Sequence, residues 1–132
     1  QLERLEEFID KKRCIGKRYN ELFSDLKGVQ LPLPKDDAAN NIYWVYGLVL
    51  NQSMNISATE AINRLAEMGI GCRPFFCPMN QQPVLLDRGL FKGEIYPEAD
   101  RLYKYGFYVP SGLALTPQQQ EKVASSVFQV LT

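Results

Sequence analysis

Ile42-Tyr43-Trp44-Val45-Tyr46-Gly47-Leu48-Val49-Leu50 is the stretch that decides the fold. Aromatic and β-branched side chains dominate it, and such residues favour a strand in a packed sheet. A second strand is predicted over residues 70–76 and a short third strand over residues 107–109. Between the first two strands, Ser57 and Glu60 have the spacing of a capping box, which predicts a helix that ends at Gly69.

Helices are expected on both sides of these strands. Residues 1–27 carry an apolar stripe at three- and four-residue steps, typical of one long helix, and Gly28 is expected to end it in the left-handed conformation. Pro97 opens a helix over residues 97–105, and Thr116-Pro117-Gln118-Gln119 is a typical start for a last helix. The order predicts an α+β fold in which a small three-stranded sheet is covered by helices.

The length and composition restrict the possible functions. The 132 residues fit a single domain, with residues 1–27 as a leading helix and residues 28–132 as a small α/β domain. The formal net charge of +0 argues against a nucleic-acid partner, and no apolar run approaches the ~20 residues of a membrane span. Without histidine the chain has no imidazole for Ser-His-Asp or Cys-His catalysis or for a His-rich zinc site. The odd number of cysteines, 3, indicates a reducing compartment and inert thiols.

One segment stands out as a candidate binding region. Residues 77–96 form a loop that is long for a compact domain, and such loops are often functional or lie against a partner. Just before it, Arg73 at a strand end is followed by Phe75 and Phe76, which suits contact with an anion or a sugar phosphate. The alternative is an arginine at a sheet edge with Phe75 or Phe76 in the core. No lysine lies in a setting that would activate it for Schiff-base chemistry.

An ordered series of motifs covers nearly the whole chain: residues 1–9, 69–78 with Gln82-Pro83, 96–102, Gly106, and 110–113 with Leu115-Thr116. Together they resemble the C-terminal part of the DegT/DnrJ/EryC1/StrS family of pyridoxal phosphate-dependent nucleotide-sugar aminotransferases, in particular its perosamine-synthetase-like members. The resemblance implies the fold of the C-terminal small domain of type I aminotransferases. The large domain that binds pyridoxal phosphate would be absent from this chain.

The resemblance also implies an activity for the full-length enzyme. It would bind pyridoxal 5'-phosphate, act as a cytoplasmic homodimer and transfer an amino group from glutamate to a nucleotide-linked 4-keto-6-deoxy sugar. The family's Schiff-base lysine lies upstream, so this chain alone is expected to bind no cofactor and to be inactive. We expect the isolated chain to self-associate through residues 1–27.

The same resemblance suggests which residues face the sugar nucleotide. The corresponding segment is residues 73–82, in which Arg73 would contact a negatively charged or polyhydroxyl group and Phe75 or Phe76 would form an apolar wall. Asn80 stands where many relatives carry a histidine, and its amide keeps hydrogen bonding without titration.

Two other hypotheses stay open. The chain could be a non-enzymatic α+β interaction module that dimerises through its first helix. It could also be a family relative that has lost catalysis and works as a regulator or sensor. The sequence that precedes Gln1 would distinguish the interaction module from the enzyme. An upstream Schiff-base lysine would distinguish the enzyme from a relative that has lost catalysis.

Overall fold

A four-stranded antiparallel sheet forms the centre of the computed structural model, which describes residues 2–132. Its strands follow the order β1 (Val29–Gln30), β2 (Tyr46–Leu50), β4 (Gly106–Val109) and β3 (Arg73–Pro74). The predicted α+β class is confirmed, but the sheet has one strand more than predicted. The extra strand, β1, is only two residues long, so it offers no alternating pattern from which the sequence could predict it.

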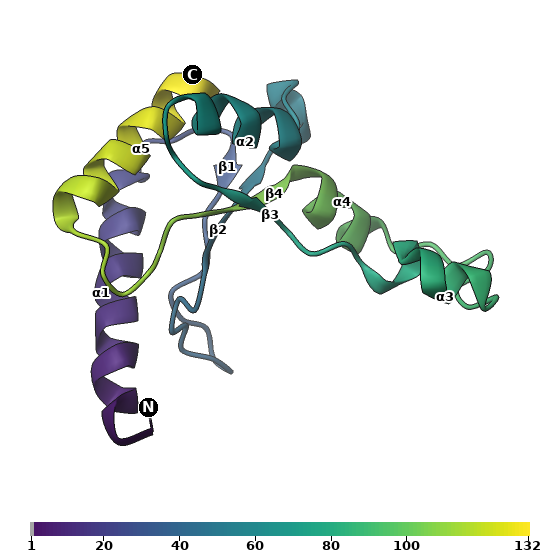
Figure 1. Cartoon of the computed structure of the whole chain (residues 1–132), viewed down its shortest axis with the longest axis horizontal. Helices are drawn as coiled ribbons and strands as arrows, with labels where there is room; N and C mark the ends of the chain where they lie inside the picture. Colours follow the sequence, from purple (N-terminus) through teal and green to yellow (C-terminus); the bar gives the residue numbers. More distant parts are fainter. Residues whose placement is uncertain (1) are drawn as a thin grey trace.

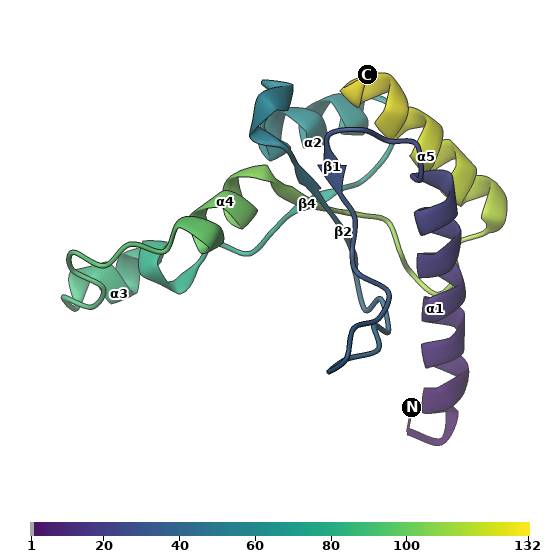
Figure 2. The same ribbon diagram turned by 180° about the vertical axis from the view of Figure 1, so that it is seen from behind.

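Helices account for most of the remaining regular structure. The five α-helices are α1 (Leu5–Leu22), α2 (Ala58–Glu67), α3 (Pro83–Asp87), α4 (Pro97–Tyr105) and α5 (Pro117–Leu131). Short 3-10 helices cover Leu2–Arg4, Gln52–Met54 and Met79–Gln81. Figures 1 and 2 both show α1 and α5 along one side of the sheet, and α3 and α4 on the other.

The hydrophobic core lies between one face of the sheet and helices α1, α2 and α5. Tyr46 and Leu48 of β2 and Phe107 of β4 are fully buried there. From α1, the ring of Tyr19 packs 4.8 Å from the ring of Tyr46, measured between centroids. The hydroxyl of Tyr19 donates to the carbonyl oxygen of Pro110 over 2.7 Å, so α1 is tied to the sheet side by polar as well as apolar contacts.

The predicted first helix is too long at both ends. It begins at Leu5 and ends at Leu22, because the next residues turn to bury Phe23 and Leu26 in the core. Gly28 is left-handed as expected, with φ +77°, but it lies beyond that turn. At the other end, Leu5 is 47% exposed because the first turns of α1 project away from the sheet (Figure 1).

Two predicted strands are also shorter than expected. The first begins at Tyr46 instead of Ile42, since Tyr43 adopts a left-handed backbone with φ 51°. The second is reduced from residues 70–76 to Arg73–Pro74. By contrast, the last helix has the expected cap, in which Thr116 and Gln119 bond each other's backbone reciprocally.

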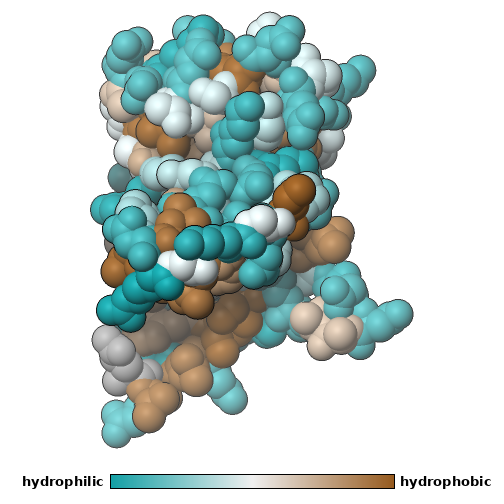
Figure 3. Space-filling view, turned by 90° about the vertical axis from the view of Figure 1, so that its right-hand side faces the viewer, coloured by the Kyte–Doolittle hydropathy of each residue, from teal (hydrophilic) through white to brown (hydrophobic). Residues whose placement is uncertain are grey.

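Residues 76–96, which we call the arm, project from the rest of the molecule together with α4 (Figure 1). The predicted irregular loop 77–96 is partly helical, because Met79–Gln81 and Pro83–Asp87 form short helices. No residue of the arm is buried. Seen from the arm's side, apolar groups gather in the middle and lower parts of the molecule, and the upper part is mainly hydrophilic (Figure 3). Within residues 2–132, no helix combines the length and apolarity needed to cross a bilayer.

Candidate functional site

Three of the four predicted site residues converge on Tyr108 of β4. Arg73 lies directly opposite Tyr108 in the β3–β4 register. The ring of Phe75 stacks on the Tyr108 ring with centroids 4.5 Å apart and planes 23° apart. The Phe76 ring is tilted against Tyr108 at 6.2 Å. We call Arg73, Phe75, Phe76 and Tyr108 the Tyr108 cluster.

The alternation of β4 explains why Tyr108 is available. Phe107 and Val109 point into the core, so Tyr108 between them points to the opposite face of the sheet. This alternation is the signal that identifies Tyr108, which sequence reasoning missed. Arg73 pairs with Tyr108 and therefore lies on the same open face.

Two glycines make room for the Phe75 ring. A Cβ on Gly106 would lie 2.5 Å from Cδ2 of Phe75, and a Cβ on Gly47 would lie 2.8 Å from its Cζ. The amide of Phe75 donates to the Gly106 carbonyl oxygen over 3.1 Å. Phe75 is therefore half-buried on the open face, and Phe76 is 75% exposed, so neither ring belongs to the helix-covered core.

The open face carries a groove whose walls are mostly apolar. Its volume is about 280 Å³, and Val45, Gly47, Val49, Phe75, Leu102 and Tyr108 contribute to its walls. Burial raises the pKa of Tyr108, so its hydroxyl is protonated at neutral pH and can donate a hydrogen bond. The exposed guanidinium of Arg73 has no side-chain partner within residues 2–132, which leaves its five donors available.

Asn80 lies apart from the Tyr108 cluster, on the 3-10 helix Met79–Gln81 of the arm. Its Nδ2 donates to Oδ1 of Asp100 over 3.3 Å. Nε2 of Gln81 donates to the same oxygen over 2.5 Å. Sequence reasoning missed Asp100, since an acidic residue in the first turn of α4 is already explained by the helix dipole.

Lys12 tests the expectation that no lysine lies in a setting that would activate it for Schiff-base chemistry. It is half-buried on α1, and burial lowers its pKa, which is the direction that favours a reactive amine. However, its Nζ donates to the Ser111 carbonyl oxygen over 2.5 Å, and no carboxylate within residues 2–132 forms an ion pair with it. A pyridoxal phosphate site needs a lysine for the aldehyde and an acidic partner for the ring nitrogen, so these contacts do not fit one.

The cysteine and acidic side chains offer neither an activated thiol at Cys72 nor a metal site within the described residues. Cys14, Cys72 and Cys77 are all free. Burial raises the pKa of Cys72 to about 11, so this thiol stays protonated at neutral pH. In the part of the chain that the structure describes, no three Cys, Asp or Glu residues are grouped so that they could hold a metal ion.

Comparison with known proteins adds the evidence of descent. Residues 1–128 match the model of the DegT/DnrJ/EryC1/StrS aminotransferase family. EpsN of Bacillus subtilis (strain 168), named as a pyridoxal phosphate-dependent aminotransferase, is 34% identical over 125 residues, which are 93% of this chain and 31% of EpsN. GDP-perosamine synthase of Vibrio cholerae is 25% identical over 96% of this chain and 34% of its own length.

A solved structure supports the same fold. PseC of Helicobacter pylori, an aminotransferase involved in the biosynthesis of pseudoaminic acid, superposes with a TM-score of 0.86 at 18% identity. The superposition covers 99% of this chain and 34% of PseC. The chain thus spans about a third of the length of the relatives that it matches.

Proposed function

Because the chain belongs to the DegT/DnrJ/EryC1/StrS aminotransferase family, we propose that the intact protein is a pyridoxal phosphate-dependent sugar aminotransferase. It transfers an amino group from glutamate to a nucleotide-linked 4-keto-6-deoxy sugar. The observation that carries this proposal is the family match over residues 1–128, which leaves only the last four residues outside. The proposed site of action is the cytoplasm, with which the three free thiols agree.

In this proposal the chain is the small domain that supplies substrate contacts, and another part of the intact protein holds the cofactor. The contacts of Lys12 support this division, since its ammonium group is already bonded to the Ser111 carbonyl oxygen. The open groove beside Tyr108 supports the substrate role.

Arg73 is the residue that we propose for the charged part of the substrate. A guanidinium can bind a phosphate through two parallel hydrogen bonds, and Arg73 lies directly opposite Tyr108, whose ring is stacked with Phe75. Phe75 and Phe76 form the apolar wall, and the Tyr108 hydroxyl adds a donor. Asn80 contributes an amide from the arm.

The test is turnover by the intact protein with ¹⁵N-glutamate and a nucleotide-linked 4-keto-6-deoxy sugar, followed by mass spectrometry of the sugar. We expect a labelled amino sugar, and we expect Arg73→Leu to raise KM for the sugar by about tenfold or more, as loss of a hydrogen-bonded charge does. Arg88→Leu is the matched control, because Arg88 is exposed and has no side-chain partner within the described residues.

Both alternatives predict no labelled sugar, and calorimetry with the nucleotide sugar distinguishes them. A relative that has lost catalysis would bind the nucleotide sugar through Arg73 without labelling it. An interaction module would neither bind nor label it. Either result would reject the proposed function.

We also propose that the intact protein is a homodimer and that the isolated chain self-associates through residues 1–27. Leu2 and Leu5, which are 85% and 47% exposed, support this proposal because they leave an apolar end on α1. A clean monomer in sedimentation of the concentrated chain, unchanged by Leu5→Glu, would reject the proposed self-association.

A further inference from the structure

The arm has no buried side chain of its own and contacts the rest of the molecule through few side chains, which either pack, as Phe76 does against Tyr108, or form hydrogen bonds. All 21 residues from Phe76 to Tyr96 are exposed or half-buried. Within residues 2–132, every side-chain hydrogen bond between the arm and the rest of the chain ends on Oδ1 of Asp100. The donors are the amides of Asn80 and Gln81.

Asp100 also determines which way the Asn80 amide is turned. An ionised carboxylate can only accept hydrogen bonds, so the NH₂ group of Asn80 must face it. The amide oxygen of Asn80 then points away from Asp100 and has no donor within the described residues. The arm therefore presents a hydrogen-bond acceptor at this position.

We infer that Asp100 is a positioning residue that orients the Asn80 amide, so that its oxygen accepts a hydrogen bond from a hydroxyl or amino group of the sugar. This inference rests on the proposed function. The second bond, from Gln81, fixes the 3-10 helix that carries Asn80. Asp100 acts through Asn80 and does not itself touch the substrate.

The chemistry of the contact provides a conservative variant. Both amides use the same oxygen of Asp100, so an asparagine at this position can offer an equivalent acceptor with its own amide oxygen. Asp100→Asn should therefore keep the arm in place, whereas Asp100→Ala removes the acceptor. Asp87→Ala is the control, because Asp87 lies in the arm, is exposed and has no side-chain partner within residues 2–132.

The experiment uses the intact protein and two readouts. Hydrogen–deuterium exchange of residues 76–96, measured without substrate, reports whether the arm is held. We expect Asp100→Ala to speed this exchange by about tenfold, as loss of hydrogen bonds to a charged group does, and Asp100→Asn and Asp87→Ala to leave it near wild type.

Kinetics with the nucleotide sugar tests whether Asp100 acts through Asn80. We expect Asp100→Ala to raise KM by about tenfold with kcat within about threefold. Asp100→Asn should raise KM less, because it keeps an acceptor for both amides but no longer excludes the flipped Asn80 amide. The KM of the double variant Asn80→Ala/Asp100→Ala should be no higher than that of Asn80→Ala alone, because both changes remove the same contact between Asn80 and Asp100.

Three results would overturn the inference: equal exchange of the arm in Asp100→Ala and Asp87→Ala, equal damage by Asp100→Asn and Asp100→Ala, or additive effects in the double variant. If the wild-type protein aminates no sugar, the proposed function fails. The exchange of the arm in the three single variants then still decides whether Asp100 holds it.

Discussion

The sheet with its helices and the arm are stabilised in different ways. Between the sheet and helices α1, α2 and α5, residues such as Tyr19, Leu48 and Phe107 are fully buried. The arm instead exposes seven large apolar side chains, namely Phe76, Met79, Val84, Leu86, Leu90, Ile95 and Tyr96. Burial is therefore the main stabilisation of the first region, with hydrogen bonds such as that from Tyr19 to Pro110 in addition. The arm has no buried side chain, and its side-chain hydrogen bonds to the rest of the described residues end on Asp100.

The largest effect should come from a paired truncation in the two regions. Phe107→Ala removes a fully buried ring from the centre of the core and should cost about 4 kcal/mol of unfolding free energy. Leu90→Ala in the arm, where the side chain is 49% exposed, should change it by less than about 0.5 kcal/mol. Urea denaturation measures both, and similar midpoints for the two variants would break the comparison.

A smaller loss is expected at Gly106 in the sheet, next to the Tyr108 cluster. Its added Cβ would lie 2.4 Å from the Leu102 carbonyl oxygen and 2.5 Å from the Phe75 ring. Gly106→Ala should therefore cost about 2 kcal/mol by overpacking and weaken binding at the Tyr108 cluster. Gly71→Ala is the control, since nothing lies within 4 Å of a Cβ built there. Equal stability of the two variants would show that the Phe75 ring does not depend on Gly106.

Helix capping should contribute about 1 kcal/mol to the stability of the first region. Thr116 caps α5 through a complete capping box, whereas α3 in the arm has no side-chain cap. Thr116→Ala should cost about 1 kcal/mol in thermal or urea unfolding. Thr59→Ala, at an exposed position with no side-chain hydrogen bond within residues 2–132, should cost less than half as much. A larger loss from Thr59→Ala would contradict the cap assignment.

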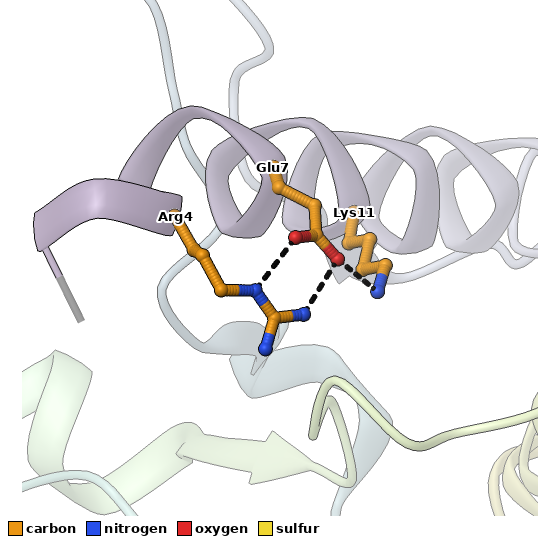
Figure 4. Close-up of polar contacts among 3 residues, drawn as sticks. All are labelled: Arg4, Glu7 and Lys11. Carbon is orange, nitrogen blue, oxygen red and sulfur yellow. Dashed lines mark hydrogen bonds and ion pairs between the residues drawn. The ribbon is translucent and has the colours of Figure 1, made fainter.

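The smallest effect concerns the projecting start of α1. There Glu7 accepts hydrogen bonds from Arg4 and Lys11 (Figure 4), and these contacts, the Arg4 bond first, lower its pKa from 4.5 to about 2. Because the folded-state pKa is the lower one, the stabilisation is present above pH 4.5 and is lost as the pH falls towards 2. Both ion pairs of Glu7 lie on the surface. Salt near 1 M, where the screening length is about 3 Å, should therefore weaken them.

An NMR titration of the Glu7 carboxyl carbon checks this assignment. In the wild type the carboxyl should titrate near 2, and in the double variant Arg4→Gln/Lys11→Gln its pKa should return towards 4.5. An unchanged titration in the double variant would show that neither cation perturbs Glu7.

Local signals in the sequence predict the helices better than the strands. Proline and capping residues mark α4 at Pro97–Tyr105 and α5 after Thr116, and both helices begin where predicted. The Ser57 cap also forms, but Glu60 pairs with Arg64 instead of completing the capping box. Strand lengths depend on pairing partners far along the chain, such as Val29 with Leu50, so local composition overestimates β2 and misses β1.

In the candidate site too, local sequence signals identify neighbouring residues but not contacts between distant segments. Arg73, Phe75 and Phe76 are adjacent in the sequence and carry its signal, so they could be predicted together. Tyr108 joins them only through the β3–β4 pairing, and Asp100 meets Asn80 only through the return of the arm onto α4. Such contacts between distant segments leave no local pattern in one sequence.

The most direct test of the proposed function is the intact mass of the natural protein before and after borohydride reduction, followed by peptide mapping. Reduction fixes a cofactor that is bound to a lysine through a Schiff base. We predict the gain of a pyridoxyl group on a lysine outside residues 1–132. No gain in mass, or a pyridoxyl group on Lys12, would contradict the proposal that this chain is the substrate-binding small domain of a pyridoxal phosphate-dependent aminotransferase.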